Sequence, residues 1–226
     1  KSFKIMEAVR KGKVAKGKEP KWKDEYIPLM KEHDVPDWYI KSCEKIKYMF
    51  PKAHAAAYVT NAFRIAWFKV HIPLAYYAAY FSIRAKAFDA SCMIFGKEKV
   101  KNKMKEIEMK NQKKEATKAE LDMYDDLEIV LEMYERGFEF LPVDLYESEA
   151  TRFKVQDNKL RPPLNSIPGF GGVAAQGIVE ARKDGKFMSI DDLKIRAKIG
   201  ASGADLLKEF GCLEGMSQSN QLSLFG

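Results

Sequence analysis

The chain has 226 residues, an apolar fraction of 46% and a formal net charge of +7. This size suits one large domain or two small ones, and the apolar fraction predicts a buried core. The apolar stretch from Ala55 to Ile83 is interrupted by three basic residues and a proline, which excludes a bilayer-spanning helix. No signal peptide follows the basic N-terminus, and three widely spaced cysteines without a nearby His exclude a zinc site and a disulfide scaffold. We expect a soluble, cytoplasmic protein.

The charge is unevenly distributed along the chain. Residues 1–23 hold nine Lys or Arg and two Glu, and residues 97–118 hold nine Lys and four Glu. Residues 119–150 hold eleven acidic residues and a single Arg. This pattern fits a protein oriented on a polyanion, and it fits equally well a set of solvated helix faces.

The first 97 residues predict helices separated by breakers. A short helix should end near Arg10, followed by a flexible basic loop, because residues 1–35 are polar and Gly12 and Gly17 interrupt any continuous helix. Apolar residues at helical spacing predict further helices, stopped by Pro51 and Pro73, over residues 37–50, 54–71 and 74–81.

Two charged helices and one hairpin are predicted next. The helices should cover about 98–110 and 118–136, because Thr117 and Glu120 fit a capping box and Gly137 fits a helix stop. The single strand-like stretch, residues 151–161, predicts a β-hairpin that turns at Asp157 and Asn158. Short helices with Gly-rich turns should fill 164–213, and a polar tail follows at 214–226.

The segment from Leu164 to Ile178 carries a specific pattern. Two glycines flank one apolar residue, which allows a tight turn, and the next helix presents unpaired N–H groups that suit a phosphate oxygen. The pattern resembles the helix-hairpin-helix motif, which grips duplex DNA without reading bases. The resemblance implies that the DNA-binding residues are Pro168, Gly169, Phe170, Gly171 and Gly172. Ser189 is a candidate N-cap downstream, and a second, degenerate hairpin is expected around 199–211. An ordinary αα-hairpin is the alternative.

The end of the polar tail carries apolar residues that have no core to join. Residues 221–225 are similar to the bacterial clamp-binding motif. The resemblance implies docking on the β sliding clamp through Gln221, Leu222, Ser223, Leu224 and Phe225. A tail that folds back on its own domain is the alternative.

An aromatic and basic stretch runs from Tyr48 to His71. On a helix, His54, Tyr58, Asn61 and Ile65 share one face, and a basic group one turn from a Tyr suits a nucleotide. A plain core with snorkelling lysines explains the composition equally well.

The string from Ile46 to Phe81 resembles the fingers domain of bacterial family C DNA polymerases, whose signature contains the Pro-Lys-Ala-His-Ala-Ala-Ala-Tyr run of residues 51–58. The surrounding residues are closest to the PolC form, the DNA polymerase III alpha subunit, and the similarity runs along the whole chain. It implies a mainly α fold in four parts: fingers over 1–97, a charged connector with the β-hairpin over 98–160, a helix-hairpin-helix domain over 161–213 and a clamp-binding tail over 214–226. It also implies a nucleotide-facing surface made of Lys52, His54, Tyr58 and Arg64.

The family has a palm domain, in which aspartates bind two Mg²⁺ ions, and a proofreading exonuclease. In the family the palm precedes the fingers, so the resemblance implies that it lies upstream of Lys1. The pairs Asp125-Asp126 and Asp191-Asp192 are expected on helix surfaces, so no catalytic residue or metal ligand is assigned. The chain should bind duplex primer–template, dNTP, the clamp and other replisome subunits but be inactive alone.

Two other classes remain open. A stand-alone helix-hairpin-helix DNA-binding protein that docks on the clamp would lack fingers, whereas residues 46–81 resemble them. A membrane-surface protein would need a helix with a Lys-rich face and Trp anchors, which we do not find.

Overall fold

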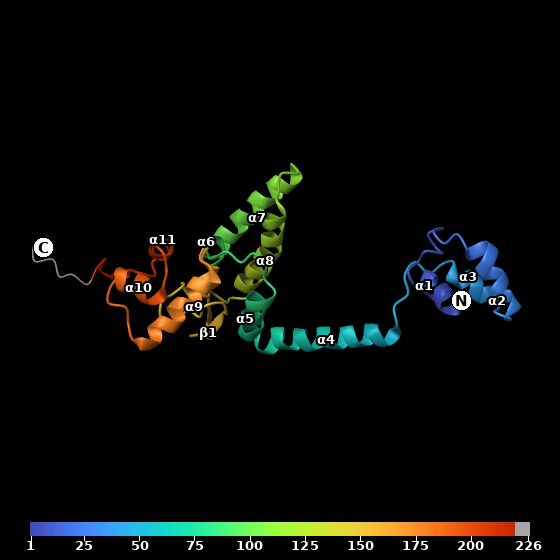
Figure 1. The fold of residues 1–226 in the computed structure, drawn as a ribbon, viewed down its shortest axis with the longest axis horizontal. Coiled ribbons are helices and arrows are strands. Elements are labelled where there is room, and N and C mark those ends of the chain that lie inside the picture. The colour runs from blue at the N-terminus through green and yellow to red at the C-terminus, as the bar shows by residue number, and fades with distance from the viewer. Residues whose placement is uncertain (220–226) are drawn as a thin grey trace, which may run out of the picture. The chain divides into compact units, whose positions relative to one another are not determined.

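The computed structural model describes residues 1–219 and divides into two compact units, Lys1–Ile65 and Ala66–Gly226 (Figure 1). The described residues are mainly α-helical with one two-stranded antiparallel sheet, so the predicted fold class is confirmed. The boundary between the units falls within one helix, α4 (Lys52–His71). The four predicted parts were defined by their expected functions, and they remain predictions.

The first unit is built around a small apolar core. Its elements before α4 are α1 (Ser2–Arg10), a π-helical turn η1 (Trp22–Tyr26), α2 (Ile27–Glu32) and α3 (Asp37–Cys43). Trp22, Tyr26 and Met30 are buried together with Val9 and Ile40. The first three recur every four residues, so they share one helical face.

Two predictions for this unit are wrong. Residues 22–32 are helical rather than a flexible loop, because the Trp22, Tyr26 and Met30 stripe is buried despite the Lys-rich surroundings. The helix predicted over 37–50 ends at Cys43. The chain instead returns to the first residues: Met49 N donates to Arg10 O at 3.0 Å, and Lys47 O lies where a Cβ on Gly12 would stand.

The second unit holds the rest of α4 and all later elements. They are α5 (Pro73–Ile83), α6 (Ala90–Met93), α7 (Lys97–Gln112), α8 (Lys118–Glu135), β1 (Lys154–Gln156), β2 (Lys159–Arg161), η2 (Leu164–Ser166), α9 (Gly172–Ala181), η3 (Arg182–Asp184), α10 (Ile190–Ala197) and α11 (Ala201–Glu209). α5 to α8 and the β-hairpin enclose one core, and the elements from η2 onward enclose a second.

Helices α7 and α8 form an antiparallel pair that Figure 1 shows side by side. Ion pairs join both ends, with Lys97 3.6 Å from Glu135 and Lys110 2.6 Å from Glu120. The predicted capping box is confirmed: Thr117 accepts from the Glu120 N–H, and the Glu120 carboxylate accepts from the Thr117 N–H. The Lys110 ammonium and the Thr117 donors lower the pKa of Glu120 to about 2. Gly137, with φ of 82°, follows the end of α8 as predicted.

The predicted β-hairpin is confirmed. Lys154 pairs with Arg161 and Gln156 with Lys159, which leaves a two-residue turn. Asp157 and Asn158 occupy this turn with φ of 50° and 58°, the left-handed values that a type I′ turn requires.

Asp126 is not on a helix surface, as the sequence suggested for the 125–126 pair. Its side chain is 3% exposed and accepts hydrogen bonds from the N–H groups of Lys86 at 3.0 Å and Ala87 at 2.8 Å. Burial raises the pKa of this carboxyl. The buried carboxylate therefore anchors the loop after α5, which fixes where Lys86 emerges.

The three cysteines are sheltered from solvent. Cys43 and Cys92 are buried, and Cys212 is partly buried. Burial raises the pKa of the Cys43 thiol, that of Cys92 to about 11 and that of Cys212 to about 12. Among residues 1–219, no helix has the length and apolar character needed to cross a bilayer.

Candidate nucleic-acid interface

The predicted hairpin is a tight turn between η2 and α9. Phe170 N donates to Ile167 O at 3.0 Å, and Gly169 between them has φ of 79°. Ile167 and Phe170 are buried, with 1% and 4% of their surface exposed, so they anchor the turn in the core. Pro168 and Gly169 remain exposed at its tip. The predicted DNA-binding residue Phe170 is therefore a structural anchor, while its neighbours face solvent.

The N-terminus of α9 is open to solvent. Gly171 is its N-cap, offers no side-chain oxygen to the helix, and no acidic residue occupies the first turn. The first N–H groups of a helix have no intrahelical acceptor, and the helix dipole adds a partial positive charge. Gly171 and Gly172 are exposed, and the Val173 side chain is 91% exposed. A Cβ on Gly171 would meet no atom within 4 Å. This end of α9 is thus accessible to an anion.

Close helix packing holds the hairpin in place. A Cβ on Gly177 would lie 2.4 Å from Ala197 O, so α9 and α10 approach at a distance that only glycine allows. Arg182 donates to Leu145 O at 3.0 Å and to Ser148 O at 2.7 Å, which ties the end of α9 to the preceding loop. The predicted N-cap Ser189 accepts from Asp192 N at 3.1 Å.

A second hairpin joins α10 to α11 through residues 198–200, slightly before the predicted 199–211. Lys198 is left-handed with φ of 54°, and Gly200 is the N-cap of α11. This hairpin packs on the first: a Cβ on Gly169 would stand 3.5 Å from Leu206, and one on Gly203 3.4 Å from Phe170. The two hairpins therefore form one structural body.

The predicted nucleotide-facing residues all lie on α4. Among residues 1–219, α4 is the one helix of this length with no buried residue, and Tyr58 is 67% exposed. The His54 and Tyr58 rings lie 4.3 Å apart, as their spacing predicted, and Phe50 stacks on His54 at 5.1 Å. Lys52 and Arg64 are about 18 Å apart along the helix, since each residue adds about 1.5 Å. Their Cα atoms are therefore too far apart for both side chains to converge on one small group.

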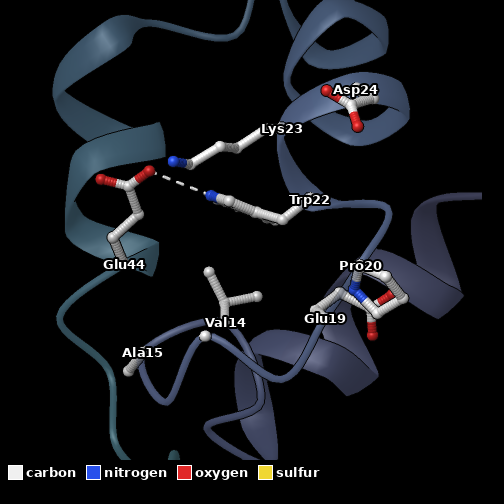
Figure 2. Close-up of a pocket in the computed structure, with 9 residues that line it drawn as sticks. Val14, Ala15, Glu19, Pro20, Trp22, Lys23, Asp24 and Glu44 are labelled. Atoms are coloured by element: carbon white, nitrogen blue, oxygen red, sulfur yellow. Dashed lines mark hydrogen bonds between the residues drawn. The ribbon is translucent and has the colours of Figure 1, made fainter.

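Sequence reasoning missed a pocket of about 550 Å³ in the first unit. Figure 2 shows Trp22 and Lys23 extending from η1 toward Glu44, which follows α3. Trp22 Nε1 donates to Glu44 Oε1 at 3.0 Å. The rest of the wall comes from the loop after α1, including Val14 and Glu19. Side chains of both charges line it, and this mixture selects no particular ligand class.

The predicted clamp-binding residues, Gln221 to Phe225, lie outside the described residues. Within residues 1–219, no three His, Cys, Asp or Glu side chains gather in a way that could hold a metal ion. Asp192, one of the paired aspartates, accepts from Met188 N at 2.9 Å at the start of α10. It stabilises a helix terminus.

Comparisons with known proteins agree with this geometry. Residues 137–222 match a family described as "Helix-hairpin-helix motif", which confirms the predicted motif. The chain is 54% identical over 224 residues to the DNA polymerase III PolC-type of Halalkalibacterium halodurans and 52% identical over 224 residues to that of Bacillus subtilis. It is 50% identical over 225 residues to that of Clostridium perfringens.

These matches cover 99–100% of the chain but 15% of each relative. Along its whole length, the chain is thus similar to one portion, about 15%, of PolC-type DNA polymerase III.

Proposed function

We propose that the chain is the C-terminal portion of a replicative DNA polymerase of the PolC type, in which it grips product duplex, faces the incoming nucleotide and tethers the enzyme to the sliding clamp. The observation that carries this proposal is identity of 50% or more over 224 residues to PolC-type polymerases. The same similarity disfavours a stand-alone DNA-binding protein, because it includes residues 46–81 as well as the hairpin.

The duplex grip rests on the open start of α9. Helix N–H groups and a partial positive charge suit a phosphate oxygen, which carries no base identity. The exposed glycines at 171 and 172 allow the DNA backbone to approach closely. Binding should therefore be similar for unrelated duplexes and should weaken steeply as salt rises.

A graded series at Gly171 tests this grip. Gly171 has φ of −71° and ψ of 150°, which any residue adopts, and its Cβ direction is open. Gly171→Ala and Gly171→Val should leave the fold intact but block the phosphate. We expect affinity for unrelated duplexes to fall about 10-fold in Gly171→Ala and about 100-fold in Gly171→Val, since a charge-assisted hydrogen bond contributes about 1.5–3 kcal/mol. Fluorescence anisotropy measures affinity, and a thermal melt checks the fold.

Unchanged affinity in both variants would remove the hairpin from the DNA contact. A lower melting temperature in Gly171→Ala would show that the position is structural. Equal loss of affinity for every duplex is part of the expectation, so a strong sequence preference would also contradict the proposed mode of binding.

The fingers role rests on the exposed face of α4 with its stacked His54 and Tyr58 rings. Catalysis would come from a palm with two Mg²⁺ ions, so primer extension with Mg²⁺ should show no incorporation by this chain alone. In an intact polymerase, Lys52→Ala and His54→Ala should raise the dNTP KM or lower kcat about 10-fold with little change in primer–template affinity. Template-dependent synthesis by the chain, or loss of primer–template affinity in both variants, would contradict this part.

The clamp role rests on the sequence of residues 221–225. A short apolar segment on a polar tail fits docking into a partner's groove.

A further inference from the structure

A second polar pocket, of about 230 Å³, lies beside the hairpin of the second unit. Its lining includes Phe81, Phe88 and Phe153 together with polar side chains from three separate segments, residues 82–86, 151 and 165–166. The Phe88 and Phe153 ring centroids are 4.8 Å apart, so these two rings pack against each other. The surface that this pocket offers to a ligand is thus mainly polar.

The pocket borders the start of α9. Thr151, on its rim, comes so close to the helix that a Cβ on Gly172 would lie 3.7 Å from Thr151 Cγ2. Two backbone hydrogen bonds fix this arrangement: Leu164 N donates to Glu149 O at 2.9 Å and Asn165 N to Ala150 O at 3.1 Å. Thr151 therefore stands beside the start of α9, and Asn165 lies against Ala150, the residue before Thr151.

The rim offers polar groups that the fold does not use. The two serine hydroxyls are already engaged: Ser166 donates to Pro163 O and Ser82 to Ala78 O, each at 2.6 Å. Ser82 also accepts from Phe153 N at 2.9 Å. Thr151 and Asn165 are exposed, and their hydroxyl and amide groups can donate to an incoming oxygen.

Lys86 supplies a positive charge to the same rim. Its backbone is held by the buried Asp126 carboxylate, while its side chain is 72% exposed. Its ammonium lies 3.7 Å from an Asp122 carboxylate oxygen, and an ion pair this exposed contributes little. The fold thus places this lysine at the surface, where it can exchange the Asp122 carboxylate for another anion.

We propose that this pocket extends the DNA contact beyond the hairpin by binding the neighbouring backbone of the same strand. Asn165 and Thr151 donate hydrogen bonds to phosphate oxygens, and Lys86 neutralises phosphate charge. This inference rests on the proposed duplex grip and adds a contact that involves no helix terminus.

Salt dependence of duplex binding tests the lysine. In the full chain, Lys86→Ala should reduce the slope of log affinity against log salt by about 0.9, because one phosphate contact is lost. Affinity at low salt should fall about 3- to 10-fold, and Lys86→Arg should restore both values. Lys183→Ala is the matched control, since Lys183 is also exposed and paired (with Glu180 at 2.6 Å) but lies beyond the other end of α9. It should change neither value.

The uncharged groups give a different signature. Asn165→Ala and Thr151→Val should each weaken binding about 2- to 5-fold, as expected for one hydrogen bond, with the salt slope unchanged. NMR shifts of the Asn165 side-chain amide, followed with duplex and separately with inorganic phosphate, distinguish DNA from a free anion. We expect shifts with duplex at concentrations where inorganic phosphate gives none.

The outcomes separate this inference from the function on which it rests. If the unmodified chain fails to bind duplex, the proposed grip itself is wrong. If it binds, and Lys86→Ala keeps the parental slope, the pocket is not a DNA contact. An Asn165 shift with inorganic phosphate but none with duplex would likewise overturn it in favour of a free-anion site.

Discussion

Deletion of Gln221 to Phe225 is expected to abolish clamp binding. We expect Leu222, Leu224 and Phe225 to be the apolar anchors. A segment of this length loses chain entropy on docking, so the intact contact should have a Kd of about 1 µM, or about −8 kcal/mol. Without the anchors, the affinity should fall at least about 100-fold. Surface plasmon resonance on an immobilised β clamp, with the full chain and its truncated form, measures the difference.

Substitutions locate the effect within the tail. Leu224→Ala combined with Phe225→Ala should lose nearly as much affinity as the deletion, since buried aliphatic and aromatic anchors contribute most of such a contact. Ser219→Ala, just before the motif, is the control and should bind normally. In an intact polymerase, we expect the proposed duplex grip to make the tail's attachment effectively intramolecular. Clamp-dependent processivity should then collapse in the truncated form while distributive synthesis persists. Equal clamp retention by the truncated and intact chains would disprove the tail's role.

Gly177→Ala is expected to destabilise the second unit strongly. The new methyl would stand 2.4 Å from Ala197 O, a backbone atom that cannot rotate away, so α9 and α10 must separate. Ala175, Ile178 and Leu193, each fully buried in the core between these helices, would lose contacts. Overpacking of this kind costs about 1–3 kcal/mol and more when backbone must move. We expect a loss of about 3 kcal/mol.

Thermal melting of the free chain, without duplex, measures this loss. For a unit of this size, about 3 kcal/mol corresponds to a melting temperature roughly 6–12 °C lower. Gly172→Ala is the matched control in the same helix, because its Cβ would meet only Thr151 Cγ2, at an ordinary 3.7 Å. That variant should melt at or slightly above the parental temperature, since alanine favours a helix more than glycine does. Equal melting temperatures for the two variants would refute the close approach of α9 and α10.

Features set by neighbouring residues could be predicted from the sequence. The Thr117 and Glu120 capping box, the Asp157-Asn158 turn and the Gly169 bend each depend on a few adjacent residues whose side chains or φ angles decide the local structure. The hairpin between η2 and α9 could also be predicted from adjacent residues. Its glycines were sufficient to indicate both the turn and the exposed helix start.

Features set by distant contacts could not be predicted. Asp126 resembled a surface acid because nothing nearby in sequence indicates the Lys86 and Ala87 N–H groups that it accepts from. The end of α3 at Cys43 depends on the return of residues 47–49 to Gly12 and Arg10. Lys86, Thr151 and Asn165 line one pocket beside the hairpin although they are far apart in the sequence. Their proximity could therefore not be predicted either.

The sheltered cysteines have a practical consequence for chemical labelling. Maleimides and disulfides react with the thiolate form of cysteine. Burial raises the pKa of Cys92 to about 11 and that of Cys212 to about 12. At neutral pH, fewer than about one in a thousand of either side chain is therefore a thiolate. Cys43 is buried as well. A cysteine introduced at an exposed position of the folded chain would therefore react far faster than the native three, and a single fluorophore could be attached without first removing them.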